Sequence, residues 1–225
     1  MDKATDDYIL LGKSRIGKGT LVGRSVIVGH PSKIKLLKTK SFSESEGAII
    51  GARCILRSFT VIYENAVLGD NVQTAHGVIV REGAKIGHDC VLGNHTVIRE
   101  GAELGINVHI MEGVVISEGA KIGNNVFIGP GVTFTAGRYM TAALETGGIF
   151  SHRKSCKLEG RYWKGPSVIV GERVRIGANA VVLAGVELHK GCVIAAGSVV
   201  SNDVPSDFLT IGNPARLMRM THNEK

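Results

Sequence analysis

The chain has 225 residues, a formal net charge of +7, 30 glycines, and only 5% aromatic residues among 44% hydrophobic ones. It is too apolar for a disordered protein, and no apolar run is long enough to cross a membrane. The first ten residues, MDKATDDYIL, lack the apolar stretch of a secretion signal, so we expect a cytoplasmic protein. Abundant glycine with few aromatics is unusual for a layered core and points to internal repeats.

A repeat of six residues runs along the chain. It begins in an N-terminal block at Ile16, Val22 and Val28. After a break, 19 of the 21 positions taken every sixth residue over 50–134 and 170–200 are Ile, Leu or Val. The position four residues later holds a small or β-branched side chain, except after Phe134, where the second insertion begins. Period six fits no helix, whereas it suits a short strand followed by a turn, with both of these positions pointing inward.

Three such units close a triangular coil of 18 residues, and the coils stack about 4.8 Å apart. Hexapeptide repeats are typical of a parallel β-helix, so the expected fold is all-β. We expect one β-helix domain over residues 1–205, formed by seven coils and the N-terminal block. A cap or tail follows at 206–225, where a short C-terminal helix would cover the open last coil.

Two loop insertions interrupt the repeat, at about 30–47 and 136–166. The first carries four lysines that either bind a nucleotide diphosphate or are simply solvated: Lys33, Lys35, Lys38 and Lys40. The second holds six basic residues and Trp163, the one tryptophan. Basic segments with so few aromatics do not indicate nucleic acid as a partner, and no membrane partner is expected.

Three of the four cysteines share the small inward position of the repeat. Cys54, Cys90 and Cys192 are therefore expected to fill the core, while Cys156 lies in the second insertion. There is no C-x-x-C spacing. We expect a reducing compartment for this chain.

The repeat resembles that of the left-handed parallel β-helix acyltransferases, the hexapeptide-repeat family. The most specific match is IGANAVVLAGVELHKGCVIAAGSVVSNDVP at 176–205, followed by IGNPARLM at 211–218. The resemblance implies a left-handed coil, a homotrimer with its active site between two subunits, acetyl-CoA as co-substrate, and no metal.

The central stretch is similar to the N-acetyltransferases of nucleotide-linked amino sugars. The similar segments are QTAHGVIVREGAKIG at 73–87, INVHIMEGV at 106–114 and NVFIGPGVTFTA at 125–136. Where that family has F-T-N, this chain has Phe134-Thr135-Ala136. The resemblance implies transfer of an acetyl group from acetyl-CoA to the amine of an amino sugar carried on a nucleotide.

Three alternatives remain open. The first is an O-acetyltransferase acting on a sugar or another small hydroxyl acceptor. The second is a zinc enzyme similar to the γ-carbonic anhydrases, although His88 and His95 are seven residues apart rather than five and lie on different corners. The third is a non-catalytic β-helix scaffold.

Acyl transfer to an amine needs a base, donors for the oxyanion, and contact between the substrates. Residues 18 apart should stack, which places His76, Asn94 and Glu112 in one corner column. His76 leads as base or acceptor contact, and its TAHG context also matches the amino-sugar enzymes. His109, in an outward strand position, comes next, with Asn107 as a thioester or acceptor contact. An amine that arrives neutral would need no protein base.

Another column of small residues suggests the acyl-CoA site. Ala178, Ala196 and Pro214 are 18 apart, and small side chains on one corner would leave a groove for the pantetheine amides. Arg216 or Arg219 would meet the CoA phosphates.

Overall fold

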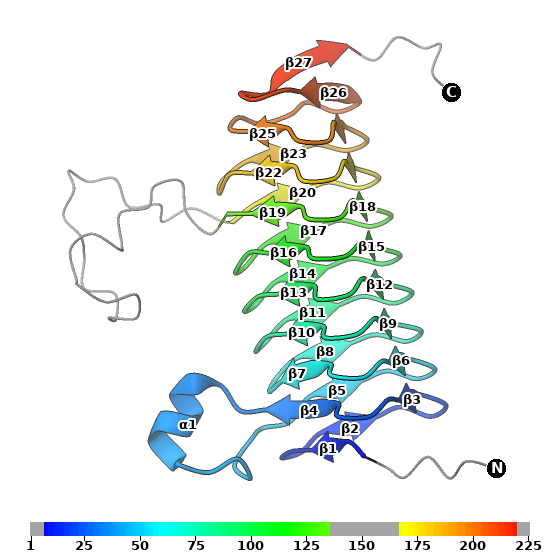
Figure 1. The fold of residues 1–225 in the computed structure, drawn as a ribbon, viewed down its shortest axis with the longest axis vertical. Coiled ribbons are helices and arrows are strands. Elements are labelled where there is room, and N and C mark those ends of the chain that lie inside the picture. The colour runs from blue at the N-terminus through cyan, green and yellow to red at the C-terminus, as the bar shows by residue number, and fades with distance from the viewer. Residues whose placement is uncertain (1–6, 136–166, 220–225) are drawn as a thin grey trace.

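The computed structural model describes residues 7–135 and 167–219, and within them the chain winds into a parallel β-helix (Figure 1). Short strands enter three long sheets in turn, which we call sheets A, B and C. Each coil therefore contributes one strand to every sheet, as Figure 1 shows for the stacked arrows. The expected all-β repeat architecture is confirmed.

Each sheet runs the length of the molecule. Sheet A contains β1 (Ile9–Leu10), β4 (Ile27–His30), β7 (Val61–Tyr63), β10 (Ile79–Val80), β13 (Val97–Ile98), β16 (Val115–Ile116), β19 (Thr133–Phe134), β22 (Val181–Val182) and β25 (Val199–Val200). Sheet B contains β2 (Arg15–Ile16), β5 (Ile49–Ile50), β8 (Val67–Leu68), β11 (Lys85–Ile86), β14 (Glu103–Leu104), β17 (Lys121–Ile122), β20 (Ile169–Val170) and β23 (Glu187–Leu188). Sheet C contains β3 (Leu21–Val22), β6 (Ile55–Leu56), β9 (Gln73–Thr74), β12 (Val91–Leu92), β15 (His109–Ile110), β18 (Phe127–Ile128), β21 (Arg175–Ile176), β24 (Val193–Ile194), β26 (Phe208–Ile211) and β27 (Arg216–Arg219).

The core consists of the repeat positions that the sequence places inward. All 21 positions of the six-residue series are at most 5% exposed. Cys54, Cys90 and Cys192 are buried free thiols, as expected. Burial, followed by the charge of Asp207, raises the pKa of the Cys192 thiol to about 12, so this thiol is inert at neutral pH. Cys156 lies outside the described residues.

Both insertions leave the β-helix at the same corner, where the chain passes from sheet A to sheet B. Ile16 pairs with Ile50 and Ile122 with Val170, so these two coils are longer than the usual 18 residues. The N-terminal block is therefore in register with the rest once the first insertion is skipped. The residues of the second insertion lie outside the described part of the chain.

The first insertion contains a helix where a loop was expected, α1 (Lys33–Thr39). Ser32 caps its N-terminus, where the Oγ atom accepts a hydrogen bond from the N–H of Lys35 at 3.2 Å. Lys40 ends it in the left-handed conformation, with φ of 53°. The capping serine and the run of lysine, leucine and isoleucine explain the helix. Among the described residues, no helix is long and apolar enough to cross a membrane.

The expected C-terminal helix is wrong for the described residues, which form a β-hairpin up to Arg219. Strand β26 pairs in parallel with β24, and β27 folds back antiparallel onto β26. The open edge of β24 offers unpaired backbone groups that a strand satisfies directly, and the intervening Gly212 and Pro214 do not suit a helix. Val199 donates its N–H to the carbonyl of Gly212 and accepts from the N–H of Ala215, both at 3.0 Å, so Pro214 lies beside Val199 rather than over Ala196. Pro214 is thus not part of the small-residue column.

Candidate functional site

One corner of the β-helix joins the two columns that the sequence suggested separately. We call it the C–A corner, since the chain passes there from sheet C to sheet A. Strand register aligns one residue per coil along it: Ser58, His76, Asn94, Glu112, Pro130, Ala178 and Ala196. The long coil around the second insertion hid this alignment, because Pro130 and Ala178 are far more than 18 residues apart.

His76 lies exposed on this corner. Its backbone N–H donates to Oδ1 of Asn94 at 3.0 Å, whereas its ring has no hydrogen-bond partner within residues 7–135 and 167–219. His76 lines a shallow hollow of about 230 Å³ together with Arg57 and Ser58. An unengaged imidazole beside an exposed guanidinium is suited to contact an anionic ligand.

His109 points outward from β15, the strand that leads to Glu112 at the C–A corner. Asn107 orients its ring. Nε2 of His109 lies 3.0 Å from Oδ1 of Asn107, and Nδ2 of Asn107 donates to Oδ1 of Asn125 at 2.8 Å. The bond to Asn125 assigns Oδ1 of Asn107 as an acceptor, so Nε2 of His109 must donate. Nδ1 of His109 therefore keeps a free lone pair, which a general base requires.

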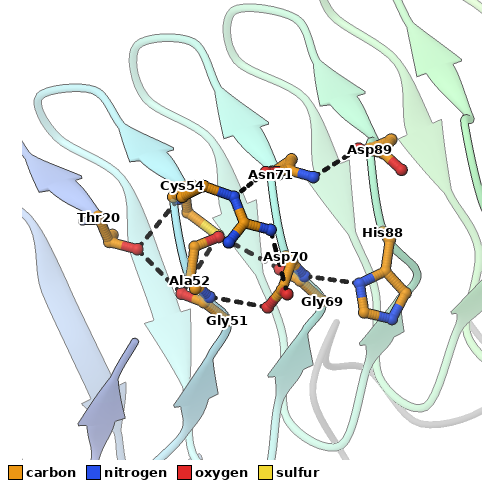
Figure 2. A network of polar contacts seen from close by, with 10 residues as sticks. Thr20, Gly51, Ala52, Cys54, Gly69, Asp70, Asn71, His88 and Asp89 are labelled. Carbon is orange, nitrogen blue, oxygen red and sulfur yellow. Dashed lines mark hydrogen bonds and ion pairs between the residues drawn. The ribbon is translucent and has the colours of Figure 1, made fainter. Parts of the chain in front are cut away.

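The corner between sheets B and C carries a polar network that the sequence analysis left aside (Figure 2). Arg53 donates through Nε to Oδ1 of Asn71 at 2.9 Å, and Asn71 donates to Oδ1 of Asp89 at 2.8 Å. The backbone N–H of Asp70 donates to Nδ1 of His88 at 2.9 Å. The partners in each of these bonds are 18 residues apart, so the sequence could have indicated that they stack. Because Nδ1 of His88 is engaged as an acceptor, its ring is a donor through Nε2 rather than a base.

The C-terminal half of the C–A corner is bare. Ala178 is half-buried and Ala196 is exposed. A Cβ atom added at Gly177 would lie 2.5 Å from the backbone nitrogen of Ala196, whereas one added at Gly197 would meet nothing within 4 Å. Gly177 is thus stacked against Ala196, whereas the backbone at Gly197 borders open space, as a groove for a chain of amides needs.

Arg216 and Arg219 are exposed on β27, next to this bare half of the corner. Arg216 pairs with Ile211, and the preceding residue of β26, Thr210, accepts a hydrogen bond from the N–H of Ala195 at 2.8 Å. The backbone of Arg216 therefore lies near the end of the small-residue stretch.

No group of three His, Cys, Asp or Glu residues suited to a metal lies in the described part of the chain. His88 lies on the corner between sheets B and C, whereas His95 follows Asn94 on the C–A corner.

Comparison with known proteins confirms the resemblance to the hexapeptide-repeat transferases. The family described as "Bacterial transferase hexapeptide (six repeats)" matches residues 65–100, 101–136 and 167–202. The family described as "Hexapeptide repeat of succinyl-transferase" matches residues 83–118.

Curated relatives match over a short segment. A 2,3,4,5-tetrahydropyridine-2,6-dicarboxylate N-acetyltransferase of Clostridium perfringens is 51% identical over 51 residues, 23% of this chain and 22% of the relative. The enzyme of the same name from Staphylococcus aureus is 46% identical over 52 residues, again 23% and 22% of the two chains. The match therefore spans about a fifth of the length of these relatives.

Solved structures match over nearly the whole chain. The UDP-N-acetylglucosamine acyltransferase from Campylobacter jejuni has a TM-score of 0.67 at 16% identity and covers 95% of this chain and 73% of its own. The Arabidopsis enzyme has a TM-score of 0.56 at 17% identity, with 96% and 71% covered. Likenesses at this identity concern the fold, and the expected left-handed parallel β-helix is confirmed.

Proposed function

The chain carries the hexapeptide repeat of the bacterial transferases, and on this basis we propose that it is an acyl-CoA-dependent acyltransferase. It moves an acetyl group from acetyl-CoA to the amine of a nucleotide-linked amino sugar. The observation that carries the proposal is the division of the C–A corner into a polar half, from His76 to Glu112, and a bare half at Ala178 and Ala196. The two halves extend over five coil steps, about 24 Å.

The bare half suits acetyl-CoA. The pantetheine arm lies along Ala178 and Ala196, where exposed backbone meets its amides, and Arg216 meets its phosphates. The thioester then points along the corner toward Glu112 and Asn94. The side chain of Asn94 accepts from His76 through Oδ1, which leaves Nδ2 as a donor for the oxyanion of the tetrahedral intermediate.

The polar half suits the acceptor. Arg57 lines the same hollow as His76, so a nucleotide diphosphate binds there by charge. The amine attacks the thioester carbon, the CoA thiolate leaves, and the amine proton passes through Nδ1 of His109 to that thiolate. Asn107 is a positioning residue that holds the tautomer of His109, and His76 contacts the acceptor.

A homotrimer is supported by the outer face of sheet A, which is apolar in every described coil except the one that carries Thr133. One residue per coil points outward there: Ile9, Ile27, Val61, Ile79, Val97, Val115, Thr133, Val181 and Val199. The same positions of sheet B include Arg15, Lys85, Glu103 and Lys121. A continuous apolar face usually marks an interface, and sheet A adjoins the C–A corner. A neighbouring copy packed there would form the second wall of the site.

A cytoplasmic location is also proposed, since the three described cysteines are free thiols.

The decisive experiment measures thiol release from acetyl-CoA with a panel of amine acceptors. The panel contains amino-nucleotide-sugars, the corresponding hydroxyl sugars, and the cyclic dicarboxylate named for the curated relatives. Turnover with an amino-nucleotide-sugar alone supports the proposal. Turnover with a hydroxyl acceptor would make the chain an O-acetyltransferase. Failure of acetyl-CoA to bind near millimolar concentration in calorimetry would refute acyl transfer altogether.

A further inference from the structure

Helix α1 presents an outward face that combines aliphatic and basic side chains. Ile34 is 66% exposed and Leu37 is 53% exposed, and they share one side of the helix because they are three residues apart. Lys33, Lys38 and Lys40 are exposed and stand three or four residues from one or other of these two. We call these five residues the lysine-rimmed face.

The opposite side of α1 faces the rest of the insertion. Nζ of Lys35 bonds Oε1 of Glu46 at 2.8 Å, and Leu36 and Thr39 are half-buried. A surface helix normally turns its aliphatic residues inward. Here two of the three aliphatic side chains point to solvent side by side, and contiguous exposed apolar surface of this kind marks interaction sites.

This orientation is held by the β-helix itself. The carboxylate of Glu64, which is 4% exposed, accepts hydrogen bonds from the N–H groups of Ser32 at 2.9 Å and Glu46 at 3.2 Å. The ring of His30 lies 4.7 Å from that of Tyr63 and 5.6 Å from that of Phe42. Both ends of the insertion are therefore fastened, and α1 cannot simply roll its apolar residues inward.

Phe42 extends the apolar surface beyond the helix and is 56% exposed. The lysine-rimmed face contains three positive charges and no acidic residue. Of the nearby carboxylates, Glu46 is paired with Lys35 and Lys13, whereas Glu44, two residues after Phe42, is exposed. Large apolar side chains ringed by lysines match the boundary of an anionic bilayer, where ammonium groups meet phosphates and apolar groups enter the acyl region.

Against the expectation of no membrane partner, we propose that the lysine-rimmed face and Phe42 dock this protein on the surface of an anionic membrane. The contact needs no spanning segment and is reversible, because few apolar side chains take part. In Figure 1, α1 projects from the side of the β-helix near its N-terminal end, so a flat surface can reach it.

Co-sedimentation of the full chain with vesicles tests the proposal. Vesicles of phosphatidylcholine with 30% phosphatidylglycerol are compared with pure phosphatidylcholine. We expect binding to the anionic vesicles alone. The double variants Ile34→Ser with Leu37→Ser, and Lys38→Glu with Lys40→Glu, should each lower the partition coefficient at least tenfold.

Matched controls carry the same chemical changes elsewhere. Ile49→Ser with Val67→Ser removes two exposed aliphatics from sheet B, and Lys18→Glu with Lys121→Glu reverses two exposed lysines. Both should bind anionic vesicles within twofold of the parent chain, and circular dichroism checks that all variants fold. No binding to anionic vesicles overturns the proposal, as does full binding by the Ile34 and Leu37 variant. If that variant forms a smaller oligomer in solution than the parent chain, a second copy of the chain covers the face. That result would also overturn the proposal.

Discussion

Oδ1 of Asn107 accepts a hydrogen bond from Nε2 of His109 at 3.0 Å, and this bond leaves Nδ1 of the imidazole with its lone pair. His109→Ala should therefore lower kcat for acetyl transfer at least a hundredfold. Asn107→Ala should lower kcat about tenfold with little change in KM, because the tautomer is no longer held. His189→Ala, which removes a ring paired with Glu187 at 3.5 Å, is the control. Equal activity of the His109 and His189 variants would remove His109 from the mechanism.

His76 has a different expected signature, since its ring is exposed and unengaged beside Arg57. His76→Ala should raise the KM for the acceptor about tenfold while kcat changes less. Arg57→Ala should do the same. Steady-state kinetics with the acceptor varied at saturating acetyl-CoA make the distinction. A hundredfold loss of kcat with unchanged KM would instead make His76 the base.

The repeat made the core predictable, because a period of six decides by itself which side chains point inward. The same arithmetic placed His76, Asn94 and Glu112 in one column, and strand register agrees. It could not place Ala178 in that column, since the length of the second insertion breaks the count between Pro130 and Ala178.

The C-terminal hairpin and the His88 network depend on contacts that no local pattern specifies. A helix at the C-terminus looked suitable from the residues alone, but the exposed edge of β24 was available for pairing. Likewise, the hydrogen bond from Asp70 to His88 follows from stacking of two turns. Helix α1, in contrast, has a local signal in the sequence: the capping Ser32 followed by helix-forming residues.

Ala196→Trp should block acyl-CoA. Ala196 is exposed and aligned with Ala178 along the bare half of the corner, so an indole there would fill the groove without entering the core. We expect at least a hundredfold weaker binding of CoA by calorimetry, with unchanged circular dichroism. Asn202→Trp, at an exposed position before the last coil, is the control. Unchanged affinity of the Ala196 variant would place the groove elsewhere.

Val97→Glu should break the association of subunits. Val97 lies mid-way along the apolar face of sheet A, between Ile79 and Val115, and a carboxylate buried there would lack a partner. Light scattering after size-exclusion chromatography should show monomers, with acetyl transfer lost as well. Val67→Glu on sheet B, where the side chain is 38% exposed, should leave the assembly intact. A trimer formed by the Val97 variant would mean that sheet A is not the interface.

Acid should loosen the first insertion through Glu64. Burial alone would raise the pKa of this carboxyl, but the N–H groups of Ser32 and Glu46 and the charge of Lys35 lower it overall from 4.5. A carboxyl whose pKa is lower in the folded state than in the unfolded state stabilises the fold fully at a pH above its unfolded-state pKa. That stability is lost as the pH falls through its folded-state pKa. Hydrogen exchange of residues 31–46 should therefore accelerate below about pH 4.5 while the β-helix core stays protected.

Glu64→Gln removes the charge at every pH, because the amide keeps one acceptor oxygen and cannot ionise. It should weaken docking of the insertion by about 1–3 kcal/mol at pH 7 and abolish the acid-dependent change. Glu103→Gln, which breaks only the exposed pair with Lys85, is the matched control and should exchange like the parent chain over residues 31–46. The assignment to Glu64 fails if the Gln variant still shows acceleration below pH 4.5, since another carboxyl would then hold the insertion.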